Sequence, residues 1–117
     1  MKKFIKNLLA QLNYLFNNQK IPDIINNLNI ETTSRCNLKC KFCAYDKRDL
    51  GMVPHESMTF DFFTEVVNQA LEIGYKNIGL TPTTGDIFMD KEIFNKFKYL
   101  DKKKLLTGYY FYTNFIP

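Results

Sequence analysis

The sequence of 117 residues has no tryptophan, one histidine and three cysteines. It also lacks any apolar run near the ~18 residues that a transmembrane helix needs, so we expect no transmembrane segment. An odd number of cysteines argues against a disulfide framework. A set of free thiols fits a reducing compartment, and we therefore expect a cytoplasmic location.

The composition supports one small folded domain. Hydrophobic residues make up 45% of the chain and aromatic residues 15%, which is enough for a packed core and argues against disorder. The length permits a single domain. The net charge is +4, with lysines scattered among asparagine and aspartate, so no nucleic-acid partner is predicted.

All three cysteines lie within eight residues, at Cys36, Cys40 and Cys43. The positions between them include Asn37 and Lys39, so the segment is a polar loop and not part of a core. Three thiolates on one loop can face one inorganic centre, and thiolates are the usual ligands of iron–sulfur clusters. A [4Fe–4S] cluster held by three cysteines has one iron without a protein ligand.

A zinc site is the main alternative for this loop. His55 could complete a closed Cys3His site with the three cysteines, and the chain would then be a zinc-stabilised binding module. The sequence lacks the second C-x2-C pair that zinc modules commonly have. Gaps of two and three residues also fit disulfide geometry poorly.

Strand and helix patterns alternate along the chain. The strands show period-two alternation or clustered β-formers, and the helices show apolar stripes with the period of a helix. Thr59 is a good N-cap and Gly74 a good C′ residue. The order is strand 28–33, helix 59–74, strand 76–81, helix 90–104 and strand 109–113. Strand–helix–strand units of this spacing form parallel sheets by right-handed crossovers, so the fold class is α/β with about three parallel strands.

The two helices should each bury one apolar face. The first stripe is Phe62, Phe63, Val66, Val67, Ala70 and Leu71, and the second is Ile93, Phe94, Phe97 and Leu100. Residues 1–22 predict an amphipathic N-terminal helix and linker, which we expect to pack on the domain. A helix on a membrane surface is the alternative, because the basic residues gather at one end. Residues 23–117 form the main domain.

The C-x3-C-x2-C spacing, with Phe42 directly before the last cysteine, resembles the motif of the radical S-adenosylmethionine (SAM) superfamily. Thr84-Gly85-Asp86 follows the second strand and is similar to the Gly-Gly-Glu motif of these enzymes, with Asp86 one methylene shorter than glutamate. The third strand ends in Thr113-Asn114, where relatives often have Thr-Asn-Gly; Phe115 stands in place of that glycine.

The resemblance implies a [4Fe–4S] cluster held by Cys36, Cys40 and Cys43, with SAM chelating the open iron. It implies that Phe42 packs beside the cluster. Asp86 and the backbone of Thr83, Thr84 and Gly85 would orient the methionyl amino group of SAM, and Thr113 and Asn114 would lie near its ribose.

The implied activity is reductive cleavage of SAM to a 5′-deoxyadenosyl radical, which abstracts hydrogen from a substrate. A flavodoxin or ferredoxin would supply the electron. The substrate is unknown and would be a peptide or a small molecule. The order of the motifs is similar to that in members that carry further clusters in a C-terminal domain.

The resemblance covers residues 28 to 114, the N-terminal part of a partial (β/α)6 barrel. We therefore expect a fragment of a longer enzyme, or a chain that self-associates to cover an open sheet edge and an apolar face. For the full-length protein we expect a radical SAM enzyme. For this chain alone, cluster binding is favoured over SAM turnover, and a non-catalytic remnant is a further alternative.

Overall fold

The computed structural model describes residues 5, 12, 27–43 and 55–116. Ile5 and Leu12 are exposed; the remainder of the predicted N-terminal helix, and the boundary between residues 22 and 23, lie outside these residues. In the described part of the chain, no helix has the length and apolar character that crossing a bilayer requires.

Three short strands form one parallel sheet in the described residues. They are β1 (Asn27–Asn29), β2 (Asn77–Gly79) and β3 (Gly108–Tyr110), and they lie in the order β1-β2-β3. The α/β class and the parallel pairing are therefore confirmed. The sheet is open within the described ranges, so closure into a barrel remains a prediction.

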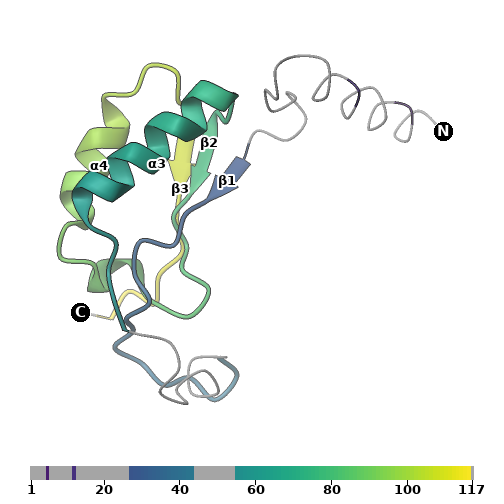
Figure 1. The fold of residues 1–117 in the computed structure, drawn as a ribbon. Helices are drawn as coiled ribbons and strands as arrows, with labels where there is room; N and C mark the ends of the chain where they lie inside the picture. Colours follow the sequence, from purple (N-terminus) through teal and green to yellow (C-terminus); the bar gives the residue numbers. More distant parts are fainter. Residues whose placement is uncertain (1–4, 6–11, 13–26, 44–54, 117) are drawn as a thin grey trace.

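Helices α3 (Phe60–Ile73) and α4 (Ile93–Asp101) lie on one face of the sheet (Figure 1). A short 3-10 helix, η1 (Ile87–Met89), precedes α4. Sequential parallel strands joined by right-handed crossovers keep their helices on the same side. This arrangement brings the carboxyl ends of all three strands together.

The predicted ends of α3 are confirmed. The hydroxyl of Thr59 accepts a hydrogen bond from the backbone N–H of Phe62 at 3.3 Å. Gly74 has φ 109°, a left-handed conformation that glycine adopts without steric cost. Its N–H donates to the carbonyl of Leu71 at 3.2 Å, which ends the helix.

The core lies between the sheet and the two helices. Leu28, Ile78 and Tyr109 are aligned across the three strands and pack on this side. The buried apolar residues are Ile30, Phe63, Val67, Ala70, Ile78, Leu80, Ile87, Ile93 and Leu100.

The opposite face of the sheet is polar along the three described strands. Side chains alternate along a strand, so the rows beside Ile78 point away from the helices. There the ring of Tyr110 lies over Gly79. A Cβ built onto Gly79 would lie 2.9 Å from that ring, so a side chain at this position would clash with it. The Tyr110 hydroxyl accepts from Asn27 at 3.0 Å and donates to Asn29 at 3.3 Å. The two rows are Asn27–Asn77–Gly108 and Asn29–Gly79–Tyr110.

The strands are shorter than the sequence predicts. β1 ends at Asn29, and Thr33 instead forms an isolated antiparallel bridge with Ser57. β2 ends before Pro82, which has no N–H to continue a ladder. Beyond β3, the backbone N–H of Tyr112 donates to the Thr81 hydroxyl at 3.0 Å in place of a backbone partner.

Two predicted core positions are wrong. Phe62 is 54% exposed and Phe94 is 64% exposed. On α4 the inward position belongs to Lys96, which is fully buried because its ammonium group donates to Asp90 at 2.5 Å and to the carbonyl of Met58. The start of this helix also differs, since it begins at Ile93 after η1 and not at Asp90.

Candidate functional site

The carboxyl ends of the three strands lie at one end of the sheet, and the cysteine loop extends from this end (Figure 1). The chain after β1 leads to Cys36, the chain after β2 to Asp86 and the chain after β3 to Asn114. Sites in parallel α/β folds form at this end of the strands.

The loop after β2 packs against the segment that leads into the cysteines. The N–H of Asp86 donates to the carbonyl of Arg35 at 2.8 Å. A Cβ added to Gly85 would lie 2.7 Å from the carbonyl oxygen of Thr33 and 2.9 Å from that of Arg35. Only glycine fits this close backbone approach, so Gly85 has a packing role in addition to its predicted one.

The segment after β3 is joined to the cysteine loop through Asn37. The side-chain amide of Asn37 donates to the carbonyl of Ile116 at 2.6 Å, and its oxygen accepts from the Asn114 amide at 3.0 Å. Asn37 lies between Cys36 and Cys40 in the sequence. The segment after β3 therefore contacts the cysteine loop directly, and the loop after β2 contacts the residues just before it.

A strap of residues 56–58 braces the chain just before Cys36. The N–H of Ser34 donates to the carbonyl of Glu56 at 2.8 Å, and the N–H of Met58 donates to the carbonyl of Thr32 at 2.7 Å. The hydroxyls of Thr33 and Ser57 lie 2.8 Å apart. Sequence reasoning missed this strap, because nothing local indicates a partner more than 20 residues away.

Cys36, Cys40 and Cys43 are each partly exposed. The N–H of Cys43 donates to the carbonyl of Cys40 at 2.9 Å, so the second half of the loop forms a turn. The side chain of Phe42 is 94% exposed. The donor chemistry fits an iron–sulfur cluster, since thiolates are its usual ligands.

The thiols do not converge in this structure. Among the described residues, no three His, Cys, Asp or Glu side chains are placed to hold a metal ion together. Neither the three cysteines nor the same cysteines together with His55, the alternative zinc ligands, are placed to hold a metal ion. The ligand role of the three cysteines stays a prediction from the sequence.

Asp86 joins the loops after β2 and β3. Its carboxylate is buried, with 4% of the residue exposed. One oxygen accepts from the N–H of Phe88 at 3.0 Å. The other accepts from the Thr113 hydroxyl at 2.7 Å and from the N–H of Asn114 at 2.8 Å. Three of the residues predicted to contact SAM are thus in direct contact with one another.

The remaining predicted residues of this loop are placed beside Asp86. The hydroxyl of Thr83 donates to the carboxylate of Glu31, at the end of β1. Thr84 and Gly85 follow it directly and are half-buried. The structure therefore gathers Thr83, Thr84, Gly85, Asp86, Thr113 and Asn114 in one region, and it leaves Phe42 on the exposed turn.

No family model matches this chain, and no solved structure matches it. Among curated proteins, GTP 3',8-cyclase of Desulforamulus reducens (strain ATCC BAA-1160 / DSM 100696 / MI-1) is 36% identical to it over 75 residues. That alignment covers 63% of this chain and 22% of the relative, so the match spans about a fifth of the relative's length. The similarity supports kinship with the radical SAM superfamily and no finer grouping.

Proposed function

We propose that this chain is part of the core of a radical SAM enzyme and that Cys36, Cys40 and Cys43 bind its [4Fe–4S] cluster. The observation that carries the proposal is that the cysteine loop follows β1 beside the loops after β2 and β3. Arg35, directly before the cysteine loop, accepts from Asp86, and Asn37 within it bonds to Asn114 and Ile116. The similarity to GTP 3',8-cyclase supports the superfamily.

The chain's own residues would hold and orient the cofactors. When bound, the cluster and SAM supply one-electron chemistry that no side chain can provide. A carboxylate has about four acceptor positions, and Asp86 uses three of them on Phe88, Thr113 and Asn114. One position remains for the ammonium group of SAM, and Gly85 keeps the loop close enough to the cysteine segment.

Phe42 directly precedes the last cysteine, and its side chain is 94% exposed. In the complete site its ring would pack beside the cluster and shield it from water. For the whole protein we propose a peptide or small-molecule substrate and a flavodoxin or ferredoxin as electron donor.

Anaerobic reconstitution with iron and sulfide, followed by EPR of the reduced protein, tests this proposal. We expect a [4Fe–4S]+ signal that changes when SAM is added.

Substituting Cys36, Cys40 or Cys43 with alanine should abolish the signal, and a full cluster in any of these variants would refute the ligand assignment. Tightly bound zinc without iron would favour the zinc module, and a cluster signal indifferent to SAM would favour a remnant.

Asp86→Asn separates the SAM role of this residue from its structural role. The amide keeps the shape of the side chain, but it has one acceptor oxygen for the several donors that surround it. We expect a loss of about 1–3 kcal/mol in the free energy of unfolding and weaker SAM binding with the cluster retained. Unchanged SAM affinity in the reconstituted variant would limit Asp86 to joining the loops.

A further inference from the structure

Exposure alternates along the chain that leads into the cysteine loop and continues through it. The residues between 35 and 41 that are exposed are every second one, namely Arg35, Asn37, Lys39 and Lys41. The residues between them, which include Cys36 and Cys40, are partly buried. The cationic side chains of this segment therefore face solvent, and the two thiols are set back from it.

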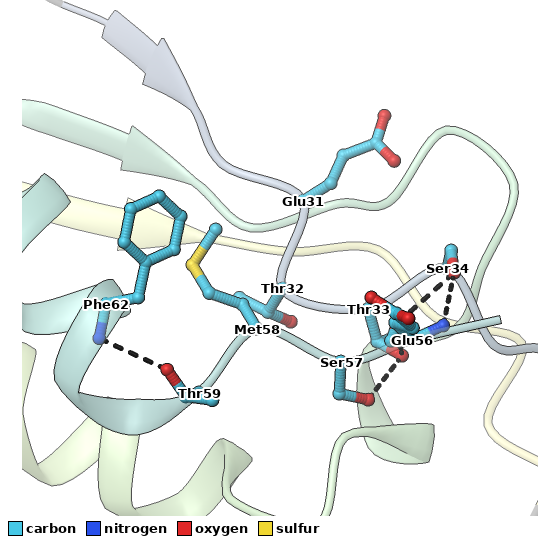
Figure 2. A pocket seen from close by; sticks show the side chains of 9 residues that line it. All are labelled: Glu31, Thr32, Thr33, Ser34, Glu56, Ser57, Met58, Thr59 and Phe62. Atoms are coloured by element: carbon cyan, nitrogen blue, oxygen red, sulfur yellow. Dashed lines mark hydrogen bonds between the residues drawn. The ribbon is translucent and has the colours of Figure 1, made fainter. Parts of the chain in front are cut away.

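The solvent-facing side of this loop is positively charged. Arg35, Lys39 and Lys41 each carry one positive charge, and residues 32–43 include no aspartate or glutamate. Glu56, on the strap that braces the loop (Figure 2), adds one exposed carboxylate, so the surface remains net positive. A surface of one sign attracts and steers partners of the opposite sign.

Exposed apolar side chains lie beside these charges. Phe42 directly follows Lys41, and its ring is exposed, as are the side chains of Phe115 and Ile116. The hydrogen bond from the Asn37 amide to the carbonyl of Ile116 joins the two segments. Exposed apolar groups with charges around them are typical of a surface that binds another protein.

We propose that this surface, formed by the exposed side chains of residues 35–42 and by Phe115 and Ile116, docks an acidic one-electron carrier protein. The proposal rests on the proposed function, because the electron needs the cluster as its acceptor. One electron would leave the carrier, which is oxidised, and enter the cluster, which is reduced from the 2+ to the 1+ state. Arg35 is adjacent in sequence to Cys36, and Lys39 and Lys41 flank Cys40, so a carrier that binds these cations is held beside the cluster ligands.

Calorimetric titration of the reconstituted full chain with an acidic flavodoxin tests the proposal. We expect binding to weaken at least about ten-fold between about 50 mM and about 500 mM salt, because salt screens the attraction. The double variant Lys39→Glu/Lys41→Glu should weaken binding about ten-fold or more at low salt. The matched control Lys98→Glu/Lys102→Glu changes the net charge equally at exposed positions on α4 and at its end, and it should bind as the wild type does.

Cluster reduction separates this proposal from the proposed function. Photoreduced 5-deazariboflavin is a small neutral reductant that needs no docking surface, so it should give the same [4Fe–4S]+ EPR signal in the wild type and in both double variants. With reduced flavodoxin, the Lys39→Glu/Lys41→Glu variant should be reduced more slowly than the wild type. If that variant fails to hold a cluster, Lys39→Gln/Lys41→Gln replaces it, and we expect weaker flavodoxin binding there too.

Two results would overturn the proposal in different ways. A wild type without a cluster would overturn the proposed function, and the docking surface with it. A wild type that holds a cluster, but binds flavodoxin with an affinity that neither salt nor the substitutions at Lys39 and Lys41 change, would overturn the docking surface alone.

Discussion

At the scale of single residues, Phe115 has φ 53°, a left-handed conformation that a bulky residue rarely adopts. Its side chain is 79% exposed, so little packing offsets the cost. Asn114 accepts the N–H of Ile116 at 2.9 Å and so fixes the turn. The residue stands where the resemblance expects glycine, and the backbone there is one that glycine adopts easily.

Phe115→Gly should therefore stabilise the protein. We expect the relief of backbone strain to exceed the added entropy of the unfolded chain, with a net gain of about 0.5–1 kcal/mol. Thermal or urea unfolding measures this gain. Phe115→Ala is the control, because it removes the ring and keeps the strain; an equal gain in that variant would show that backbone conformation is not the cause.

Tyr109 should titrate at a higher pH than an ordinary tyrosine. Burial is the main cause that raises its pKa above 10.0, and the hydrogen bond to Asp101 at 3.0 Å and the charge of that carboxylate add to it. A pKa raised on folding gives stability that is complete below the unfolded value and is lost as the pH rises through the folded one.

The stability of the protein should accordingly fall at alkaline pH, beginning near pH 10. Unfolding midpoints of the wild type and Tyr109→Phe, compared at about pH 8 and about pH 11, measure the effect. We expect the phenylalanine variant to lose less stability between the two. The same loss in both proteins would assign the alkaline effect to other groups.

At the scale of elements, the buried Lys96 joins α4 to the turn before it and to the residues that precede α3. Lys96 and Asp90 lie 2.5 Å apart, and their side chains are 0% and 1% exposed. Lys96 also donates to the carbonyl of Met58, and Glu92 accepts the N–H of Phe60 at 3.1 Å. These contacts hold the strap of residues 56–58, and through it the segment before Cys36.

Lys96→Met should destabilise the protein by about 3–5 kcal/mol, because it leaves the buried carboxylate of Asp90 uncompensated. Lys98→Met, on the exposed side of the same helix, should change the free energy of unfolding by less than about 0.5 kcal/mol. Urea denaturation of both variants measures the difference. Similar values for the two would show that the buried pair contributes little.

At the scale of the whole molecule, aromatic rings are exposed beside the edge strand β3. Phe94 packs edge-on against Phe97 at 6.2 Å between ring centres, and Phe97 stacks on Phe111 at 5.2 Å. Phe88 is 40% exposed and Phe94 64%. An apolar patch beside an unpaired strand edge promotes association.

We expect this chain to self-associate as its concentration rises, and Phe94→Glu to reduce the association by placing a charge on the patch. Analytical ultracentrifugation measures both. The control is Asn95→Glu, which adds the same charge at an exposed neighbour on α4. A wild-type protein that remains monomeric at high concentration would contradict this expectation.

The ends of α3 and the element order could be predicted because their signals are local. Thr59 caps α3 with its own side chain, and Gly74 ends it with a backbone that few other residues adopt. The strand ends could not be predicted, because Thr33 pairs with Ser57, a residue far from it in the sequence. Lys96 was missed for the same reason: a lysine is buried only when distant groups such as the Met58 carbonyl accept its protons.

By itself the sequence determined the α/β class and the alternation of strand and helix, and its cysteine triplet predicts iron–sulfur chemistry. These depend on periodicity, capping and residue type, which act over a few residues. Only the tertiary structure decided that Asp86 accepts from Thr113 and Asn114 and that Asn37 joins the cysteine loop to Ile116. Such hydrogen bonds depend on groups far apart in the sequence, and folding alone brings them within reach.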